Sequence, residues 1–341
     1  MATIAINGLG RIGRAAFKII LETPELELRA VNDLNAADDL AYLLNYDTIY
    51  GRYHKKVVPA PDGGLTVEQK TYPVFKEKDP ARLPWRKHNI DIVLECTGAF
   101  NQQADLQRHL DAGAKTVILS APAKSPEIVT IVHRVNATEG PPPRIMSCAS
   151  CTTNCTAPIV EVMGRRIGIE KAIMTTVHAY TATQAIVDRP NHKRRRGRAA
   201  AANLIPSSTG AAIATTKALP QYAGKFDGVA IRVPLAIGSL ADLVFVTSRH
   251  TTVEEVNMIF TEEASSERYR DVLGVTNEPV VSSDIIQDSH ASIIDLGLTQ
   301  VVDRNLVKVM SWYDNEWGYS SQMIREAVRI SKASKATQKR R

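Results

Sequence analysis

The chain has 341 residues, of which 44% are hydrophobic, and its formal net charge is +6. This length suits two domains or one large one, and the absence of any run of eighteen apolar residues predicts no transmembrane span. The sequence starts directly in a strand-like pattern, so we expect no secretory signal, and four cysteines are too few for a disulfide scaffold. We therefore expect a reduced, cytoplasmic protein.

Strand-like and helix-like segments alternate through the first half of the chain. Apolar segments bounded by turn residues predict strands at residues 3–7, 28–32, 91–96 and 116–120. Apolar residues at helical spacing predict helices between them, at residues 11–21, 36–46 and 102–112. This alternation is typical of an open parallel sheet covered by helices.

The second half has a different pattern, which begins with an apolar helix at about residues 151–166. Longer strands suited to an antiparallel sheet are expected at residues 172–180, 228–233, 240–246 and 306–311. A helix covers residues 253–260, and a last one covers about residues 317–333. The predicted fold class is α/β: a Rossmann-type parallel-sheet domain plus an α+β catalytic domain with a mostly antiparallel sheet.

The stretch GLGRIG, residues 8–13, follows the first strand and opens the first helix. Gly8 allows a tight turn, Gly10 lets the backbone approach a pyrophosphate, and Gly13 lets helix and strand pack closely. The pyrophosphate would lie at the helix N-terminus. Asp33 ends the second strand, where it can accept hydrogen bonds from a ribose and would repel a 2′-phosphate. We therefore expect NAD rather than NADP as the cofactor.

Three of the four cysteines lie in CASCTTNC, residues 148–155. A zinc site would need a second ligand pair, and Cys96 alone does not supply one, so we predict no metal. Cys148 and Cys151 have the spacing of a redox motif, but no thioredoxin-like start precedes them. Cys155 lies one helical turn after Cys151 and is expected to fill the core.

Cys151 is the candidate nucleophile because it begins the predicted helix. The helix dipole and the free N–H groups there favour a thiolate, so we expect its pKa to be lowered. The same N–H groups, near residues 152–154, could hold an oxyanion. His178 ends a strand 27 residues later and could pair with the thiol, although a lone histidine on such a strand is more often a core residue.

Two basic clusters raise nucleic acid as a possible partner. They are HKRRRGR, residues 192–198, and the tail of residues 331–341, which we expect to be disordered. Neither cluster has interleaved aromatic residues, and no RNA-binding motif is present. A basic balance also suits an enzyme that handles phosphorylated substrates, so nucleic acid is kept only as a secondary partner.

Six motifs in this order closely resemble the phosphorylating glyceraldehyde-3-phosphate dehydrogenase family, over about residues 2–333. They are AINGLGRIGR, SCTTNC, HAYTATQ, IPSSTGA, AIRVP and SWYDNE. The resemblance implies a Rossmann domain of residues 1–150 completed by the helix 316–333, a catalytic domain of residues 151–315, and usually a homotetramer. It places the activity in glycolysis and gluconeogenesis. It leaves residues 334–341 as the tail.

The resemblance also implies roles for individual residues. Cys151 matches the nucleophile and His178 the base, and Asn315 matches the residue that binds the nicotinamide carboxamide. Besides Gly8, Gly10 and Gly13, the matched cofactor positions are Arg11, Ile12, Asp33, Lys78 and Ser120. Thr181 and Arg232 match the site for the phosphate of the substrate, a phosphorylated aldehyde. The site for the attacking inorganic phosphate is matched by Ser150, Thr152, Arg196, Thr209 and Gly210.

Some positions depart from the family pattern. Ala182 and Thr183 replace a frequent Asn-Asp pair, and Cys148 stands where Asn is usual. Arg189 lies in a loop that approaches a neighbouring subunit's cofactor in the family, where it could meet a 2′-phosphate. Erythrose-4-phosphate dehydrogenase, which hydrolyses its thioester, remains an alternative, and so does a nucleic-acid-binding protein.

Overall fold

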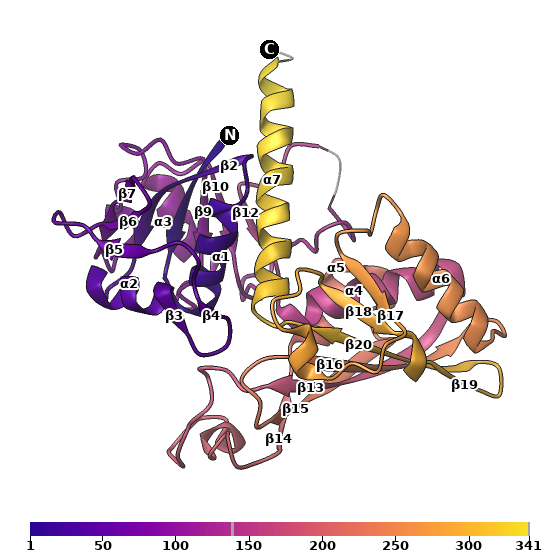
Figure 1. Ribbon diagram of the computed structural model, residues 1–341. Helices are drawn as coiled ribbons and strands as arrows, with labels where there is room; N and C mark the ends of the chain where they lie inside the picture. Colours follow the sequence, from indigo (N-terminus) through magenta and orange to yellow (C-terminus); the bar gives the residue numbers. More distant parts are fainter. Residues whose placement is uncertain (138–139, 340–341) are drawn as a thin grey trace. The chain divides into compact units, whose positions relative to one another are not determined.

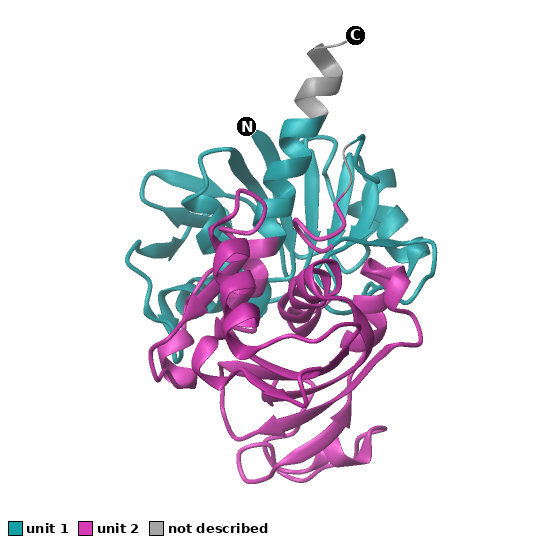
Figure 2. Ribbon diagram, turned by 90° about the vertical axis from the view of Figure 1, so that its right-hand side faces the viewer, with its two compact units in different colours: residues 1–131, 138–149, 323–341 teal, residues 132–137, 150–322 magenta. Residues whose placement is uncertain are grey.

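The computed structural model describes residues 1–137 and 140–339, with side chains described up to residue 333. Residues 340–341, at the end of the tail predicted to be disordered, lie outside the described residues. The chain forms two compact units (Figure 2). Unit 1 comprises residues 1–131, 138–149 and 323–341, and unit 2 comprises residues 132–137 and 150–322. Within the described part of the chain, no helix combines the length and apolarity that crossing a membrane requires.

Unit 1 is built on a seven-stranded sheet in the order β11-β12-β10-β9-β1-β2-β8, and its paired strands run parallel. The order reverses between β1 and β9, which is where open parallel sheets bind ligands at the carboxyl ends of their strands. The strands are β1 (Ala2–Asn7), β2 (Leu26–Asn32), β8 (Val74–Phe75), β9 (Ile92–Glu95), β10 (Thr116–Leu119), β11 (Val129–Thr130) and β12 (Ile145–Ser147).

Three helices of unit 1 connect strands of this sheet: α1 (Arg11–Leu21), α2 (Ala37–Asn45) and α3 (Gln103–Asp111). Two small additional sheets were not predicted from the sequence. They consist of β3 (Tyr46–Asp47) with β4 (Gly51–Arg52), and of β5 (Val57–Pro59), β6 (Leu65–Val67) and β7 (Lys70–Tyr72). Strands of two or three residues are too short to show a hydrophobic period.

Unit 2 is built on an eight-stranded sheet in the order β14-β15-β13-β16-β20-β18-β17, with β19 paired to β20. Its pairs are antiparallel except β13–β15 and β17–β18. The strands are β13 (Ile169–Ala179), β14 (Ile205–Ser208), β15 (Phe226–Val233), β16 (Ser239–Thr247), β17 (Leu273–Thr276), β18 (Ser292–Asp295), β19 (Gln300–Val302) and β20 (Leu306–Tyr313).

Helices α4 (Cys151–Arg166), α5 (Ala211–Ala218) and α6 (Val253–Ser265) lie on one side of this sheet (Figure 1). Burial alternates along β16, so one sheet face packs against the helices in the main core of unit 2. Helix α4 is buried on nearly all sides between Thr152 and Met163, which fixes the position of its first turn. Helix α7 (Trp317–Lys339) begins in unit 2 and continues in unit 1, six residues beyond the predicted end.

The predicted fold class is confirmed by the parallel sheet of unit 1 and the mostly antiparallel sheet of unit 2. Helix α1 and helix α4 have the predicted bounds. Helix α5 was not predicted, because its segment AAIATTKA, rich in alanine and threonine, shows little hydrophobic periodicity. Strand β14 was not predicted either, because its segment IPSS is short and mostly polar.

Candidate functional site

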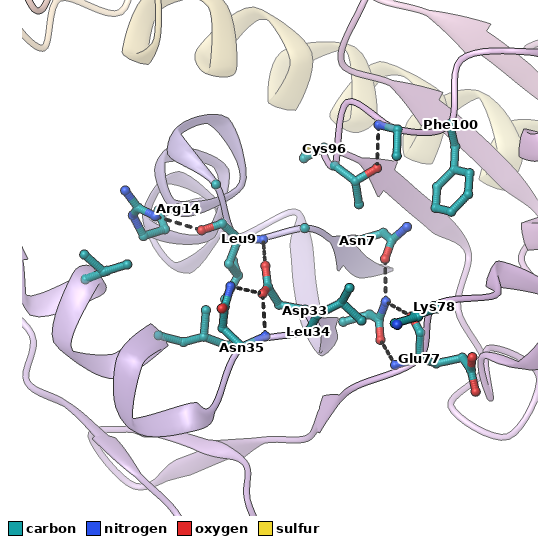
Figure 3. A pocket seen from close by; sticks show the side chains of 17 residues that line it. Asn7, Leu9, Arg14, Asp33, Leu34, Asn35, Glu77, Lys78, Cys96 and Phe100 are labelled. Atoms are coloured by element: carbon teal, nitrogen blue, oxygen red, sulfur yellow. Dashed lines mark hydrogen bonds between the residues drawn. The ribbon is translucent and has the colours of Figure 1, made fainter. Parts of the chain in front are cut away.

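Unit 1 contains a pocket of about 420 Å³ at the carboxyl ends of β1, β2 and β9 (Figure 3). We call it the nucleotide pocket. Its walls come from the four loops that follow β1, β2, β8 and β9, and from residues of α1 and α2. The pocket is lined by Asn7, Gly8, Leu9, Gly10, Arg14, Asn32, Asp33, Leu34, Asn35, Leu40, Leu43, Glu77, Lys78, Cys96, Thr97, Ala99 and Phe100.

The glycine turn has the close contacts that the sequence pattern predicted. A Cβ on Gly13 would lie 1.9 Å from the carbonyl oxygen of Gly8, so the turn and α1 can approach only because residue 13 is glycine. Gly8 has a φ of +92°, and a Cβ there would lie 2.8 Å from the backbone nitrogen of Thr97. A Cβ on Gly10 would meet no atom within 4 Å, so this position faces open space.

These features fit a dinucleotide. Gly10 is the N-cap of helix α1 and provides no side-chain cap, and the N-terminus of a helix is suited to bind a phosphate. The Asp33 carboxylate accepts a hydrogen bond from Leu9 N at 2.7 Å, and its other oxygen accepts two from Asn35. Asp33 therefore ties the glycine turn to the end of β2 and presents a negative charge in the pocket (Figure 3).

The structure brings only some of the predicted cofactor residues to this pocket. Gly8, Gly10, Asp33 and Lys78 line it. Arg11, Ile12 and Gly13 form the first turn of α1, and Ser120 follows β10, but none of these four is a lining residue. Asn315 belongs to unit 2, where it accepts a hydrogen bond from Ser239 at 3.1 Å.

Unit 2 holds the predicted thiol and base side by side. Cys151 is the first residue of α4, whose N-cap Ser150 accepts a hydrogen bond from Thr153 N at 3.2 Å. The Sγ atom of Cys151 lies 3.3 Å from Nε2 of His178, near the end of β13. On the other side of the imidazole, Nδ1 lies 2.6 Å from the carbonyl oxygen of Ala179. Nη1 of Arg232, which can only donate, lies 2.6 Å from the same Nδ1, so the two contacts of Nδ1 favour opposite tautomers. The tautomer with its proton on Nδ1 donates to the Ala179 carbonyl and leaves Nε2 free to accept from the thiol.

The expected lowering of the Cys151 pKa is wrong for this structure. Burial raises the pKa of the thiol, and the opposing effects of the Arg232 charge and the Thr152 N–H are smaller. Burial, together with the Arg232 charge, lowers the pKa of His178 to about 3. The resting pair is therefore a neutral thiol and a neutral imidazole, in which the helix end only partly offsets desolvation.

The other cysteines are less suited to react. Burial raises the pKa of Cys96 and of Cys155 to about 12, and it raises the pKa of Cys148 well above its usual value. Cys155 has no exposed surface, as expected for a core residue, and its sulfur lies 3.6 Å from the Ser292 hydroxyl. Cys151 is half-buried, which leaves its sulfur more accessible than that of Cys155. All four cysteines are free thiols.

Two guanidinium groups lie around the thiol and its base. Nη1 of Arg232 lies 2.6 Å from His178 Nδ1 and donates to Ala179 O at 2.9 Å. Arg196 donates to Ser207 Oγ at 2.8 Å. Burial lowers the pKa of both guanidinium groups, and the charge of Arg232 lowers that of Arg196 further. Among the described residues neither is paired with a carboxylate, and Nε of Arg232 is buried without a hydrogen-bond partner. Such a pair of cations is suited to bind anions.

The other predicted substrate residues lie in three different places. Thr181 contacts Thr183 at 2.9 Å, and Arg196 donates to the same Thr183 at 3.4 Å, so one hydroxyl links them. Thr209 and Gly210 precede α5, which starts without a side-chain cap. The Thr152 hydroxyl lies instead against Tyr313 OH at 3.0 Å, where it is buried in the core.

Several site residues were not identified from the sequence. Tyr313 binds Thr152 and Thr176 through one buried hydroxyl, and Thr183 joins Thr181 to Arg196. Tyr313 lies within SWYDNE and Thr183 within HAYTATQ, so the motifs contained both residues without indicating their contacts. Asn7, Asn32 and Thr97 line the nucleotide pocket at strand ends, which is the signal that could have found them.

A parallel sheet with a glycine turn at its switch point, together with a separate cysteine–histidine pair beside two arginines, defines a dinucleotide-dependent oxidoreductase. The described residues include no cluster of three or more potential metal ligands.

Comparison with known proteins identifies the family. Residues 2–103 match the family described as "Glyceraldehyde 3-phosphate dehydrogenase, NAD binding domain", and residues 150–315 match "Glyceraldehyde 3-phosphate dehydrogenase, C-terminal domain". The chain is 47% identical to glyceraldehyde-3-phosphate dehydrogenase 2 of Streptomyces avermitilis, over 94% of this chain and 96% of the relative. It is 46% identical to glyceraldehyde-3-phosphate dehydrogenase of Clostridium acetobutylicum, over 98% of this chain and all of the relative. The chain belongs to the glyceraldehyde-3-phosphate dehydrogenase family and is an NAD-dependent oxidoreductase.

Proposed function

We propose that this chain converts D-glyceraldehyde 3-phosphate to 1,3-bisphosphoglycerate, with Cys151 as the nucleophile and His178 as its base. The observation that carries the proposal is the 3.3 Å contact between Cys151 Sγ and His178 Nε2 at the start of a buried helix. A neutral thiol beside a neutral imidazole can pass its proton as the sulfur attacks.

The chemistry proceeds on Cys151. Its sulfur adds to the aldehyde carbon, and the thiol proton passes by way of His178 to the carbonyl oxygen, which gives a thiohemiacetal. His178 Nε2 would then take the hydroxyl proton, and NAD held in the nucleotide pocket would supply the acceptor for the hydride that leaves that carbon. Inorganic phosphate attacks the resulting thioester, the carbon–sulfur bond breaks, and the acyl phosphate leaves.

Two anionic groups must lie near one sulfur in this reaction. We assign the substrate's phosphate to Arg232 and Thr181, and the attacking phosphate to Ser150, Thr152, Arg196, Thr209 and Gly210. The lack of carboxylate partners at both arginines supports this assignment, and so does the uncapped start of α5. The inward hydroxyl of Thr152 leaves its backbone N–H as the group that could contact an anion.

For the cofactor, we propose that Gly8, Gly10, Arg11, Ile12 and Gly13 hold the pyrophosphate and that Asp33 holds the ribose. Lys78, Ser120 and Asn315 are proposed as further contacts. The uncapped start of α1 and the half-buried position of Asp33 in the wall of the nucleotide pocket support these roles. We propose residues 1–150 with the last helix as the NAD-binding domain and residues 151–315 as the catalytic domain.

Erythrose-4-phosphate dehydrogenase is the second candidate, because its substrate also carries a terminal phosphate. Retention of Arg196, Thr209 and Gly210, a site for a second anion, favours the phosphorylating enzyme. Steady-state kinetics with and without inorganic phosphate separate the two. We expect NADH formation to depend on phosphate after the first turnover. A phosphate-independent steady state that releases the free acid would overturn the assignment.

We propose a cytoplasmic homotetramer that works in glycolysis and gluconeogenesis. The family resemblance supports this proposal. The apolar side chains of Ile186 and Val187, which are 83% and 71% exposed in the single chain, support the assembly into a tetramer. Nucleic acid remains a possible secondary partner of the loop 192–198, whose residues 192–195 are exposed. Sedimentation of the purified protein tests the tetramer directly.

A further inference from the structure

Three buried side chains form a hydrogen-bonded row across the carboxyl edge of the unit 1 sheet. Glu95, Asn7 and Asn32 are the last residues of β9, β1 and β2, which are neighbours in that order. We call this row the edge ladder. Glu95 has no exposed surface, Asn7 is 1% exposed and Asn32 is 4% exposed.

The direction of hydrogen bonding along the ladder is fixed at one end by backbone. Asn32 accepts from Glu77 N at 2.9 Å and donates to Glu77 O at 2.9 Å, so its amide cannot be turned around. The same Asn32 amide donates to Asn7 Oδ1 at 2.7 Å. Asn7 must therefore present its own N–H group to Glu95, at 2.5 Å.

A second hydrogen bond to the same Glu95 oxygen comes from His109, whose tautomer is set by the indole of Trp85. Trp85 Nε1, which can only donate, lies 3.0 Å from His109 Nδ1. His109 therefore carries its proton on Nε2 and donates to Glu95 Oε2 at 3.1 Å. Asn7 and His109 thus donate to the same oxygen, Oε2, and the backbone N–H of Thr97 donates to the other oxygen, Oε1. Donors therefore face both oxygens of residue 95, an arrangement that a carboxylate satisfies and an amide does not.

The remaining oxygen of Glu95 holds the loop that follows β9. Oε1 accepts hydrogen bonds from the backbone N of Thr97 at 2.8 Å and from the Thr97 hydroxyl. Thr97 is also the residue against which Gly8 packs, since a Cβ on Gly8 would lie 2.8 Å from Thr97 N. Glu95 thus holds Thr97 in the position where Gly8 packs against it.

Each residue of the ladder leads into a different wall of the nucleotide pocket. Asn7 precedes the glycine turn, Asn32 precedes Asp33, and Glu95 precedes Cys96 and Thr97. Through Asn32 the ladder also holds Glu77, next to Lys78. Glu95 itself does not line the pocket. Burying a carboxylate without a Lys or Arg partner is costly, which argues that it serves more than packing.

We infer that Glu95 is a positioning residue for NAD, which holds the four pocket loops in the binding arrangement before the cofactor arrives. Preorganised loops bind more tightly because less order is imposed on binding. The effect acts through Thr97, Asn7 and Asn32 rather than by contact.

The test is Glu95→Gln, measured by calorimetric titration of NAD together with thermal unfolding. In one orientation the new NH2 group faces the Asn7 and His109 donors, and in the other it faces the backbone N–H of Thr97. Either way at least one donor loses its acceptor, so we expect the Kd for NAD to rise at least about tenfold. The kcat at saturating NAD should stay within about twofold. The matched control is Thr3→Val, near the opposite end of β1, which removes a buried hydroxyl that donates to Asn89 O and accepts from Asp91 N but takes no part in the ladder. It should lower Tm and leave the Kd for NAD unchanged.

The inference is overturned if Glu95→Gln lowers Tm but leaves the Kd within twofold of the wild-type value. It is also overturned if Thr3→Val raises the Kd in proportion to its loss of Tm, because affinity would then follow general stability. If Glu95→Gln does not fold, His109→Leu removes one donor to the same carboxylate, and a roughly threefold rise in Kd is expected. An unchanged Kd in that folded variant contradicts the inference.

Discussion

Tyr313→Phe removes a single oxygen atom from the core of unit 2. The Tyr313 hydroxyl lies 3.0 Å from Thr152 Oγ1 and 2.7 Å from Thr176 Oγ1. Thr152 follows Cys151, and Thr176 precedes His178 by two residues on β13. The hydroxyl therefore ties the helix that carries the thiol to the strand that carries the base.

The size of the effect follows from burial. Tyr313 is 1% exposed, Thr152 is 3% exposed and Thr176 has no exposed surface, so water does not replace the lost bonds. Two hydrogen bonds at about 1 kcal/mol each, with the hydroxyls of Thr152 and Thr176 both losing this partner, predict a loss of about 2 to 3 kcal/mol in the free energy of unfolding. For a unit of this size that corresponds to a Tm lower by about 4 to 10 °C. Looser alignment of thiol and base should lower kcat by about three- to tenfold.

The assay combines thermal unfolding with steady-state kinetics on Tyr313→Phe and on a matched control, Tyr269→Phe. Tyr269 is fully buried in the same unit and donates to Glu161 at 2.8 Å, so its loss should destabilise the protein comparably. Only Tyr313→Phe should lower kcat. An equal fall in kcat in both variants, or an unchanged Tm in Tyr313→Phe, would refute the reasoning.

Four further outcomes are expected. Burial raises the pKa of Cys151, so its thiolate forms only as the pH rises. Iodoacetamide should label Cys151 before the other cysteines, and the labelling rate should still increase above pH ~8.5. A labelling rate that reaches its plateau below pH ~7 would contradict this expectation. Gly13→Ala should prevent folding or NAD binding, because the new Cβ would meet the carbonyl oxygen of Gly8. Gly10→Ala should fold normally, because no atom lies near its Cβ, but titration should show weaker NAD binding. Cys155→Ser should cost about 1 kcal/mol of stability in denaturant melts and leave kcat intact, whereas Cys151→Ser should abolish turnover with little change in Tm. The wild type should prefer NAD over NADP at least about tenfold in kcat/KM, and Asp33→Ala should narrow that gap by improving NADP use.

Much of the fold could be predicted because its signals are local. The glycine turn defines the start of α1, and its apolar period continues to Leu21. Which strands pair is a long-range property, so the parallel pairing of β13 with β15 inside a mostly antiparallel sheet could not be predicted. The small sheets between Tyr46 and Tyr72 were missed because their strands are too short to show a pattern.

The pairing of Cys151 with His178 was predictable from the sequence, but the electrostatics of the site were not. The start of a helix at Cys151 and the end of a strand at His178 were both readable, and the structure places the two side chains together. The direction of the Cys151 pKa was wrong because desolvation depends on everything packed around the sulfur, which one segment does not reveal. The hydroxyl bridge at Tyr313 and the edge ladder join residues from distant segments, so only the folded chain reveals them.

The central proposal, that Cys151 carries the acyl intermediate, is tested most directly by trapping that intermediate. Protein mixed with glyceraldehyde 3-phosphate and NAD in the absence of inorganic phosphate is quenched in acid, digested and mapped by fragmentation mass spectrometry. The peptide that contains residues 148–155 should carry one acyl group, on Cys151, and added phosphate should remove it before the quench. An acyl group on Cys148 or Cys155, or none on any cysteine while NADH forms, would contradict the proposal.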